Sequence, residues 1–231
     1  GGATAKAAAE QIAPQADTIG AGSAASVGAG GAVNTAVSNR LSSVRSGDQY
    51  ASATSALGFS AGSGSDLQKS FWLKPFVNEI DQSDHKGVAG YDGSTYGVAT
   101  GFDAAVSNNV RLGVSYAYSQ TDIDGKGTGK SKVEVDSHQV SLYGDYTTDN
   151  FYLEGSVGYS FNEQSSKRTL AFGGINRTAS GTTDSDQFML NVGAGLPVKT
   201  GSAYFTPSVG LSYTNVETDA FTETGAGNFN L

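Results

Sequence analysis

Apolar residues alternate with small or polar residues at every second position along much of this chain. Residues 110–118 show the pattern most clearly, because their even-numbered positions are aliphatic or aromatic and their odd-numbered positions are small or polar. Successive side chains of a strand point to opposite faces of a sheet, so a two-residue period predicts β-strands. The predicted strands are 71–80, 95–106, 110–121, 138–146, 151–161, 187–198 and 203–216, and 229–231 reads as the start of another.

The connections between these segments alternate between short and long. Residues 107–109, 147–150 and 199–202 are short and carry the Asn, Asp and Gly residues of hairpin turns. The long, polar connections are 81–94, 122–137, 162–186 and 217–228. Tight turns at one rim and long loops at the other are typical of outer-membrane barrels. We therefore expect an all-β, antiparallel, up-and-down transmembrane barrel.

The two faces of the predicted strands differ in a way that suits a membrane. One face is apolar, whereas the other is mostly Gly, Ser, Ala and Asn, which fill a dry core badly but line water well. The residues expected to face lipid are Val110, Leu112, Val114, Leu153, Val157, Leu190, Val192, Val209 and Leu211. The residues expected to line the lumen are Asp103, Arg111, Asp145, Glu154 and Asn191. Aromatic residues near strand ends, Tyr143 and Tyr152 among them, indicate interfacial girdles.

The N-terminal part has a different character. Residues 18–39 carry no charge, but they contain five glycines and few large apolar residues, so we expect a flexible Gly/Ala/Ser linker rather than a membrane-spanning helix. Residues 32–45 do show helical spacing of apolar side chains. This short helix fits a polar lumen with acidic walls, where its arginines find partners; the alternative is a solvated helix outside any barrel. Its predicted pore-helix residues are Val33, Val37, Arg40, Leu41, Val44 and Arg45.

Composition removes several classes of function. The 14 basic and 22 acidic residues give a net charge of −8, which argues against nucleic-acid binding, and the absence of cysteine excludes disulfides and thiolate metal sites. The histidines, His85 and His138, lie in or beside predicted loops with no nucleophile placed next to them. The stretch 122–125 lacks the spacing of an EF-hand calcium loop. We expect no enzymatic activity, no catalytic residue, no cofactor, no metal site and a monomer.

The order of several short motifs resembles the translocator (β) domain of autotransporters, the proteins of type V secretion. The motifs are AAAEQIAP at 7–14, AVNTAVSNRLSSVR at 32–45, FWLKPF at 71–76, GYDGSTYGVATGFD at 90–103, RLGVSYAY at 111–118 and PSVGLSY at 207–213. The overall character is most similar to the rickettsial-type outer-membrane surface antigens.

The resemblance implies a barrel of about twelve strands in the Gram-negative outer membrane, with residues 32–45 threaded through its pore. It divides the chain into a passenger-end linker (1–31), a pore-threading helix (32–46), a second linker (47–70) and a barrel region (71–231). That region holds seven to eight strands, so we expect a C-terminally truncated, incomplete barrel. The implied partners are outer-membrane lipid, the barrel-assembly machinery, periplasmic chaperones and the protein's own N-terminal passenger.

Three functions remain open. The chain is expected to be an outer-membrane translocator and anchor that displays an adhesin-like passenger outside the cell. The first alternative is a porin-like channel whose lumen conducts solutes. The second is a soluble β-barrel binding module. The sequence leaves the passenger's identity and its cleavage undetermined.

Overall fold

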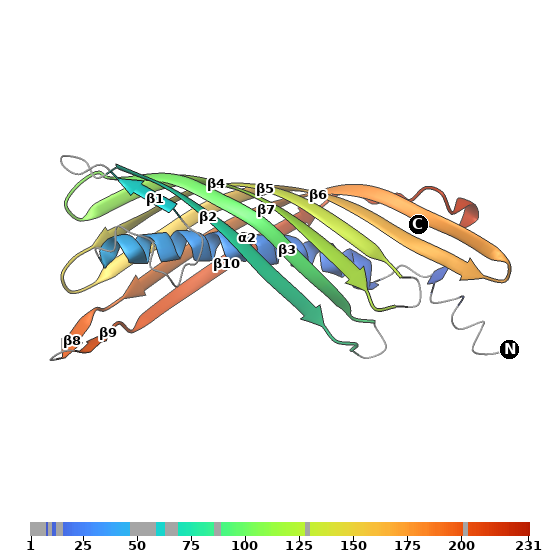
Figure 1. Cartoon of the computed structure of the whole chain (residues 1–231), viewed down its shortest axis with the longest axis horizontal. Helices are drawn as coiled ribbons and strands as arrows, with labels where there is room; N and C mark the ends of the chain where they lie inside the picture. Colours follow the sequence, from blue (N-terminus) through green and yellow to red (C-terminus); the bar gives the residue numbers. More distant parts are fainter. Residues whose placement is uncertain are drawn as a thin grey trace.

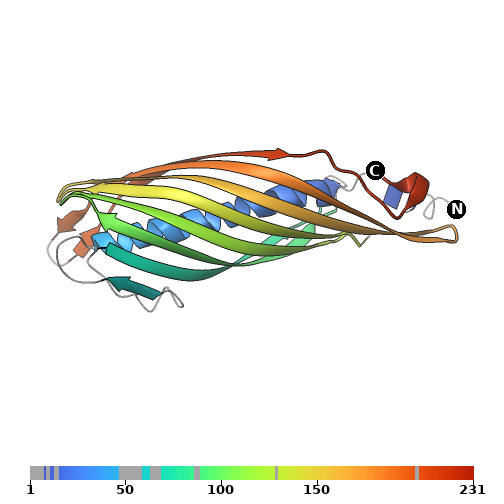
Figure 2. The ribbon, with the colours of Figure 1, turned by 90° about the horizontal axis from the view of Figure 1, so that it is seen from above.

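One curved antiparallel sheet wraps along one long helix (Figures 1 and 2). The computed structural model describes residues 8, 11–12, 16–46, 59–62, 69–85, 89–127, 130–200 and 203–231. Strands follow one another across the sheet in the order β1-β2-β3-β4-β5-β6-β7-β10. The sheet does not close among the described residues, and β1 and β10 form its edges. The expected up-and-down antiparallel arrangement with an N-terminal helix is confirmed.

The elements have the following bounds. The helix is α2 (Ala16–Arg45), and a short 3₁₀ turn, η1 (Gly227–Phe229), lies near the C-terminal end of the chain. The strands of the main sheet are β1 (Phe59–Gly62), β2 (Lys69–Gln82), β3 (Tyr91–Ala105), β4 (Val110–Gly125), β5 (Lys132–Thr147), β6 (Tyr152–Phe172), β7 (Ile175–Gly195) and β10 (Ser208–Thr218). A separate two-stranded ribbon contains β8 (Val198–Thr200) and β9 (Ala203–Phe205).

The strands are longer than the sequence pattern predicts, and the connections are correspondingly shorter. The prediction of a long loop over 162–186 is wrong, because β6 and β7 run through it and pair up to Phe172 and Ile175. Gly173 and Gly174 form the turn with φ values of +55° and +82°. A two-residue hairpin turn requires such positive φ angles, which glycine adopts without strain. Polar residues therefore continue the strands instead of ending them.

The helix is also longer than predicted. It begins at Ala16 rather than Ala32, so the expectation of a flexible linker is wrong for residues 16–31. Glycine lowers helix propensity in isolation, but tertiary contacts override propensity, and α2 contacts β2 through β7 and β10 along its length. Among the described residues, no helix combines the length and the apolarity that crossing a membrane requires.

Two smaller expectations fail as well. Within the predicted linker 47–70, residues 59–62 form β1 and pair with β2, and 69–70 already belong to β2; its other residues lie outside the described ones. The predicted strand start at 229–231 is instead the end of η1 and two residues that follow it.

The tight turns predicted at 107–109 and 147–150 are confirmed, since only four residues separate β3 from β4 and β5 from β6.

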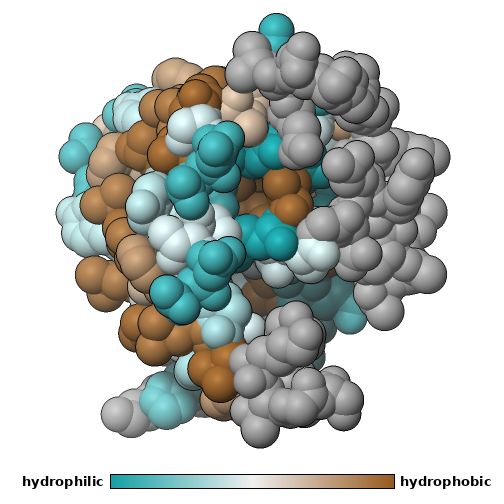
Figure 3. Space-filling model, turned by 90° about the vertical axis from the view of Figure 1, so that its left-hand side faces the viewer, coloured by the Kyte–Doolittle hydropathy of each residue, from teal (hydrophilic) through white to brown (hydrophobic). Residues whose placement is uncertain are grey.

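The sheet has an apolar outer face and a largely polar inner face. Figure 3 views the molecule from the end that carries β8 and β9, and apolar residues gather along the outer margin on its left. Large aliphatic and aromatic side chains are exposed on the outside, whereas Ser, Thr, Asn and Gln side chains of the same strands are buried toward α2. We call the end with the tight turns 106–109 and 148–151 the turn end, and the end with Gly173–Gly174 the hairpin end.

Candidate functional site: the helix and the polar wall around it

A buried acidic residue joins α2 to the wall near the turn end. The Asp103 carboxylate accepts hydrogen bonds from Arg40 Nε at 2.9 Å and Arg111 Nη1 at 2.5 Å, and Tyr143 Oη donates to it at 3.0 Å. Trp72 Nε1 in turn donates to Tyr143 Oη at 2.7 Å. Asp103 is 0 % exposed, so its charge depends on these partners instead of on water.

A second ion-pair group holds the last turn of the helix. Arg45 Nη2 lies 2.8 Å from Glu154 Oε2, and Arg45 Nη1 lies 3.6 Å from Asp145 Oδ2. The guanidinium carbon also sits 3.8 Å from the centroid of the Tyr152 ring, within the range of a cation–π interaction. Arg40 and Arg45 therefore attach the C-terminal third of α2 to four different strands, β3 to β6, directly or through Arg111.

Apolar packing supports the same part of the helix. Val33, Val37 and Leu41 are at most 2 % exposed and pack in one cluster with Trp72 and Tyr143 of the wall. Asn34 adds a polar contact, because Ser156 Oγ donates to its Oδ1 at 3.1 Å and Asn191 Nδ2 donates to Ser156 Oγ at 3.2 Å. The helix is thus held in one register by both apolar and polar contacts.

The N-terminal two-thirds of α2 contacts the wall through small residues. Ala21 and Ala25 are fully buried against Ile123, Val133 and Val135. A Cβ atom added to Gly30 would collide with Met189 Sδ, and one added to Gly22 would collide with Gln164 Oε1. At these two glycines the helix backbone lies close to wall side chains. A larger residue at either position would force the Gln164 or Met189 side chain to move.

Wall glycines make room for inward-facing aromatic rings. Trp72 pairs with Gly101, and Tyr143 pairs with Gly113, across neighbouring strands. A Cβ on either glycine would collide with ring atoms, so each ring lies directly over the glycine opposite it. The same arrangement recurs at Phe76 over Gly97 and at Tyr152 over Gly195. These four wall glycines thus have a structural explanation.

The structure brings most of the predicted site residues together. The two ion-pair groups consist of Arg40, Arg45, Asp103, Arg111, Asp145 and Glu154. Asn191 is linked to Asn34 by hydrogen bonds through Ser156, and Val44 is half-buried. The predicted lipid-facing residues Leu112, Val114, Leu153, Val157, Leu190, Val192, Val209 and Leu211 are all exposed on the outer face, and Val110 is half-buried. Their contact with lipid, and the water in the lumen, stay predictions.

Sequence reasoning missed the inward-facing aromatic residues. Tyr143, expected in a girdle, is 2 % exposed and faces the helix, and Tyr152 stacks on Arg45. Tyr143 shares the odd-numbered face of its strand with Gln139 and Ser141, so strict alternation places it inside.

No group of three or more potential metal ligands occurs among the described residues. His138 lies on the outer face, where its Nδ1 is 2.7 Å from Tyr116 Oη.

Comparisons with known proteins agree with this geometry. The model of the autotransporter β-domain family matches residues 71–231. Outer membrane protein B of Rickettsia prowazekii (strain Madrid E) is 30% identical over 203 residues, which cover 82% of this chain and 12% of that protein. Outer membrane protein A of Rickettsia rickettsii is 31% identical over 210 residues, covering 85% of this chain and 9% of that protein. This chain therefore spans about a tenth of the length of these relatives.

A solved structure has a similar fold. The translocator domain of the autotransporter NalP from Neisseria meningitidis superposes with a TM-score of 0.59 at 16% sequence identity. The match covers 86% of this chain and 63% of that one.

Proposed function

Because the chain belongs to the autotransporter β-domain family, we propose that it anchors a passenger polypeptide in the outer membrane and exports that passenger to the cell surface. The family and its Rickettsia relatives indicate a location in the bacterial outer membrane and a translocator role for the matched region, rather than an enzymatic one. In the proposed arrangement the passenger is N-terminal to α2, the hairpin end faces outside, and the turn end faces the periplasm.

The observation that carries the proposal is the attachment of α2 to the inner face of the sheet. A helix that only rested against a sheet would not need two arginines paired with buried or half-buried wall carboxylates. Removing charged groups from water is costly unless they are paired, so these pairs specify one position for the helix. Its C-terminal end is fixed at the turn end, and its N-terminal end points toward the hairpin end (Figure 1). The helix thus follows the path of an exported chain.

Conductance across planar bilayers tests whether α2 occupies a pore. The full-length protein is compared with a variant carrying Arg40→Gln and Arg45→Gln, and with a variant lacking residues 32–45. We expect a low conductance for the parent, a several-fold rise for the double substitution and a larger rise for the deletion. The control replaces two exposed cations outside the helix, Lys126 and Lys132, by Gln and keeps the parent conductance. Equal conductance with and without residues 32–45 would contradict the proposal.

Export is tested on intact cells. An epitope tag placed N-terminal to α2 should be reached by antibody and by added protease, whereas a tag in the tight turn 106–109 should be protected until the outer membrane is opened. The opposite pattern would reverse the proposed orientation. A porin-like channel predicts instead a large conductance in the parent and no exposed N-terminal tag.

Three finer parts of the proposal rest on the family alone. We propose that the passenger is an adhesin, that periplasmic chaperones carry the unfolded chain, and that the barrel-assembly machinery inserts it. Binding of cells to host surfaces with and without the passenger tests the first. Depletion of the assembly machinery, or of the chaperones, followed by measurement of the folded protein in the outer membrane, tests the other two.

A further inference from the structure

A buried cluster at the hairpin end connects three segments that are far apart in the sequence. The hairpin of β6 and β7 extends beyond the rest of the sheet (Figure 2), and the segment after β10, residues 219–231, folds back against it. Backbone hydrogen bonds join Ser180 with Thr224 in both directions, at 2.8 and 2.9 Å. Gln11, from the part of the chain before α2, contacts the same hairpin.

Arg168 of the hairpin contacts both of the other segments. Its guanidinium makes a bidentate pair with Glu223, from Nε to Oε1 at 2.7 Å and from Nη2 to Oε2 at 2.5 Å. It also donates to the backbone carbonyl of Phe229 at 2.7 Å and to that of Gln11 at 2.5 Å. The Arg168 and Glu223 side chains are only 4 % and 5 % exposed. Charge-assisted bonds in such a site are stronger than neutral ones and poorly replaced by water.

Gln11 is held by its side chain as well as by its backbone. It is 7 % exposed, and its Oε1 accepts a hydrogen bond from the backbone N–H of Ala171 at 2.8 Å. Gln11 and Ile12 are helical, and Gln11 contacts the hairpin through its main-chain carbonyl and its side-chain amide. Gln11 precedes the first residue of α2 by five positions, so it lies on the chain that enters or leaves the helix at this end.

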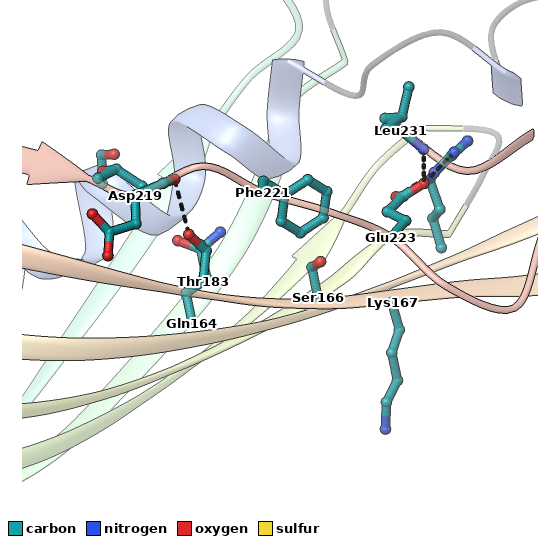
Figure 4. A pocket seen from close by; sticks show the side chains of 11 residues that line it. Gln164, Ser166, Lys167, Thr183, Asp219, Phe221, Glu223 and Leu231 are labelled. Atoms are coloured by element: carbon teal, nitrogen blue, oxygen red, sulfur yellow. Dashed lines mark hydrogen bonds and ion pairs between the residues drawn. The ribbon is translucent and has the colours of Figure 1, made fainter.

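Apolar side chains also pack within the cluster. Leu170, Ala179 and Ala226 are at most 1 % exposed, and the rings of Phe172 and Phe229 meet edge to face at 5.7 Å between centroids. Beside the cluster a cavity of about 280 Å³ is bounded by Phe221, Glu223 and residues of β6 and β7 (Figure 4). Lys167, the neighbour of Arg168, points away from this cavity in the same view. Adjacent residues of one strand therefore have opposite surroundings.

We propose that the inner face of the β6–β7 hairpin is a docking site for the protein's own N-terminal segment, with Arg168 and Ala171 binding Gln11 where the chain leaves the helix. We call these contacts the exit clasp. It orders the chain between α2 and the passenger and ties that segment to the sheet. Docking itself does not require membrane insertion, whereas the location of the clasp outside the cell rests on the proposed function.

Site-directed spin labelling of the 231-residue chain tests the clasp, since this chain carries no native cysteine. One label replaces Ile12, which is 37 % exposed beside Gln11, and a reference label replaces Val27, 43 % exposed on α2. We expect an immobilised Ile12 label in the parent and a several-fold larger mobile fraction in Arg168→Gln. Lys167→Gln removes the same charge from the adjacent, outward-facing position and should leave the Ile12 spectrum unchanged.

A charge-reversed pair separates docking from simple stability of the hairpin. The double variant Arg168→Glu with Glu223→Arg restores an ion pair, but a glutamate has no donor for the Gln11 and Phe229 carbonyls. We expect the Ile12 label to be mobile in this variant while the Val27 label keeps its parent spectrum. An Ile12 label as immobile as in the parent, in both Arg168 variants, would overturn the clasp. A mobile Val27 label in the parent would instead count against the proposed position of α2.

Discussion

At the scale of single residues, charge balance explains the contacts of α2. Three arginines, Arg40, Arg45 and Arg111, face three carboxylates, Asp103, Asp145 and Glu154, in two neighbouring groups. A buried group of this kind is tolerated when every charge has a partner, and it becomes unfavourable when one is removed. The balance therefore makes each member sensitive to substitution. It also makes the position of the helix specific, because a shift by one turn would separate the pairs.

Replacing Asp103 tests this sensitivity. Asp103→Asn removes the negative charge between two guanidinium groups, so we expect the free energy of unfolding to fall by about 3–5 kcal/mol. Urea unfolding in detergent, followed by the fluorescence of Trp72, measures it, because Trp72 is the single tryptophan and is linked to Asp103 through Tyr143. Asp149→Asn, in an exposed turn, serves as the control and should change stability by less than about 0.5 kcal/mol. A similar loss in both variants would argue against the network.

Protonation of Glu223 gives the exit clasp a pH dependence. Burial alone raises the pKa of this carboxyl, but hydrogen bonds from Arg168 and from the backbone N–H of Leu231 hold the pKa below its usual range. A depressed pKa means that the stabilisation is complete above the unfolded value of about 4.3 and is lost as pH falls through the lower folded value. We expect the Ile12 label to stay immobile down to about pH 4.3 and to gain mobility below it. In Glu223→Gln the spectrum should not change over this range.

Residue chemistry is the part of the site that the sequence predicts best. Charged residues on the small-residue face of a strand have to point inward if the other face is apolar, so the alternation alone identifies Asp103, Arg111 and Glu154 as wall residues. It does not predict which of them pairs with which arginine, because that depends on the rotation and height of α2. Trp72 is ambiguous for a related reason, since large residues lie on both faces of its strand.

At the scale of elements, the helix and the longest hairpin show where local patterns fail. Residues 16–31 have weak helix propensity, and only their contact with the wall makes them helical. The prediction for the β6–β7 hairpin fails for a different reason. Its polar outer residues resemble a loop, although Gly173–Gly174 between Phe172 and Ile175 is a recognised two-residue turn signal. If the Gly173–Gly174 dipeptide is given more weight, the sequence predicts the turn. No local sequence signal predicts that the helix starts at Ala16.

Two adjacent glycines of α2 allow a matched test of this account. Gly30 is buried against Met189 and Gln187, whereas a Cβ on Gly31 would have open space around it. Gly31→Ala should stabilise the protein by up to about 1 kcal/mol through helix propensity. Gly30→Leu should instead destabilise it by about 1–3 kcal/mol, because the added side chain overpacks the wall. Urea unfolding monitored by Trp72 fluorescence compares the two. Equal stabilisation by both substitutions would show that the helix does not approach the wall at Gly30.

At the scale of the whole molecule, the large apolar residues of the sheet lie on its outer face and many polar residues lie on its inner face, the reverse of a protein with an apolar core. Its exposed aliphatic and aromatic residues form an outer belt across every strand from β2 to β7 and β10. Beyond the belt the same outer face turns acidic, with Glu134, Asp136, Glu163, Asp184 and Asp186 toward the hairpin end. The alternation of residue types predicts this inversion correctly in outline. The curvature of the sheet follows from long-range pairing that no local pattern contains.

A charge placed within the belt tests whether this outer face contacts lipid. Val114 is 52 % exposed near the middle of the belt, and Asp122 lies on the same face of β4 eight residues further along, about 26 Å away. Val114→Arg should destabilise the protein in lipid vesicles by about 2–4 kcal/mol, because a cation at the bilayer midplane loses its hydration. Asp122→Arg should cost less than about 1 kcal/mol, since that position lies near or outside the interface. Guanidinium unfolding from vesicles, again followed by Trp72, measures both. If the two arginines cost the same, the belt does not sit in a membrane, and the inner face has to be explained without one.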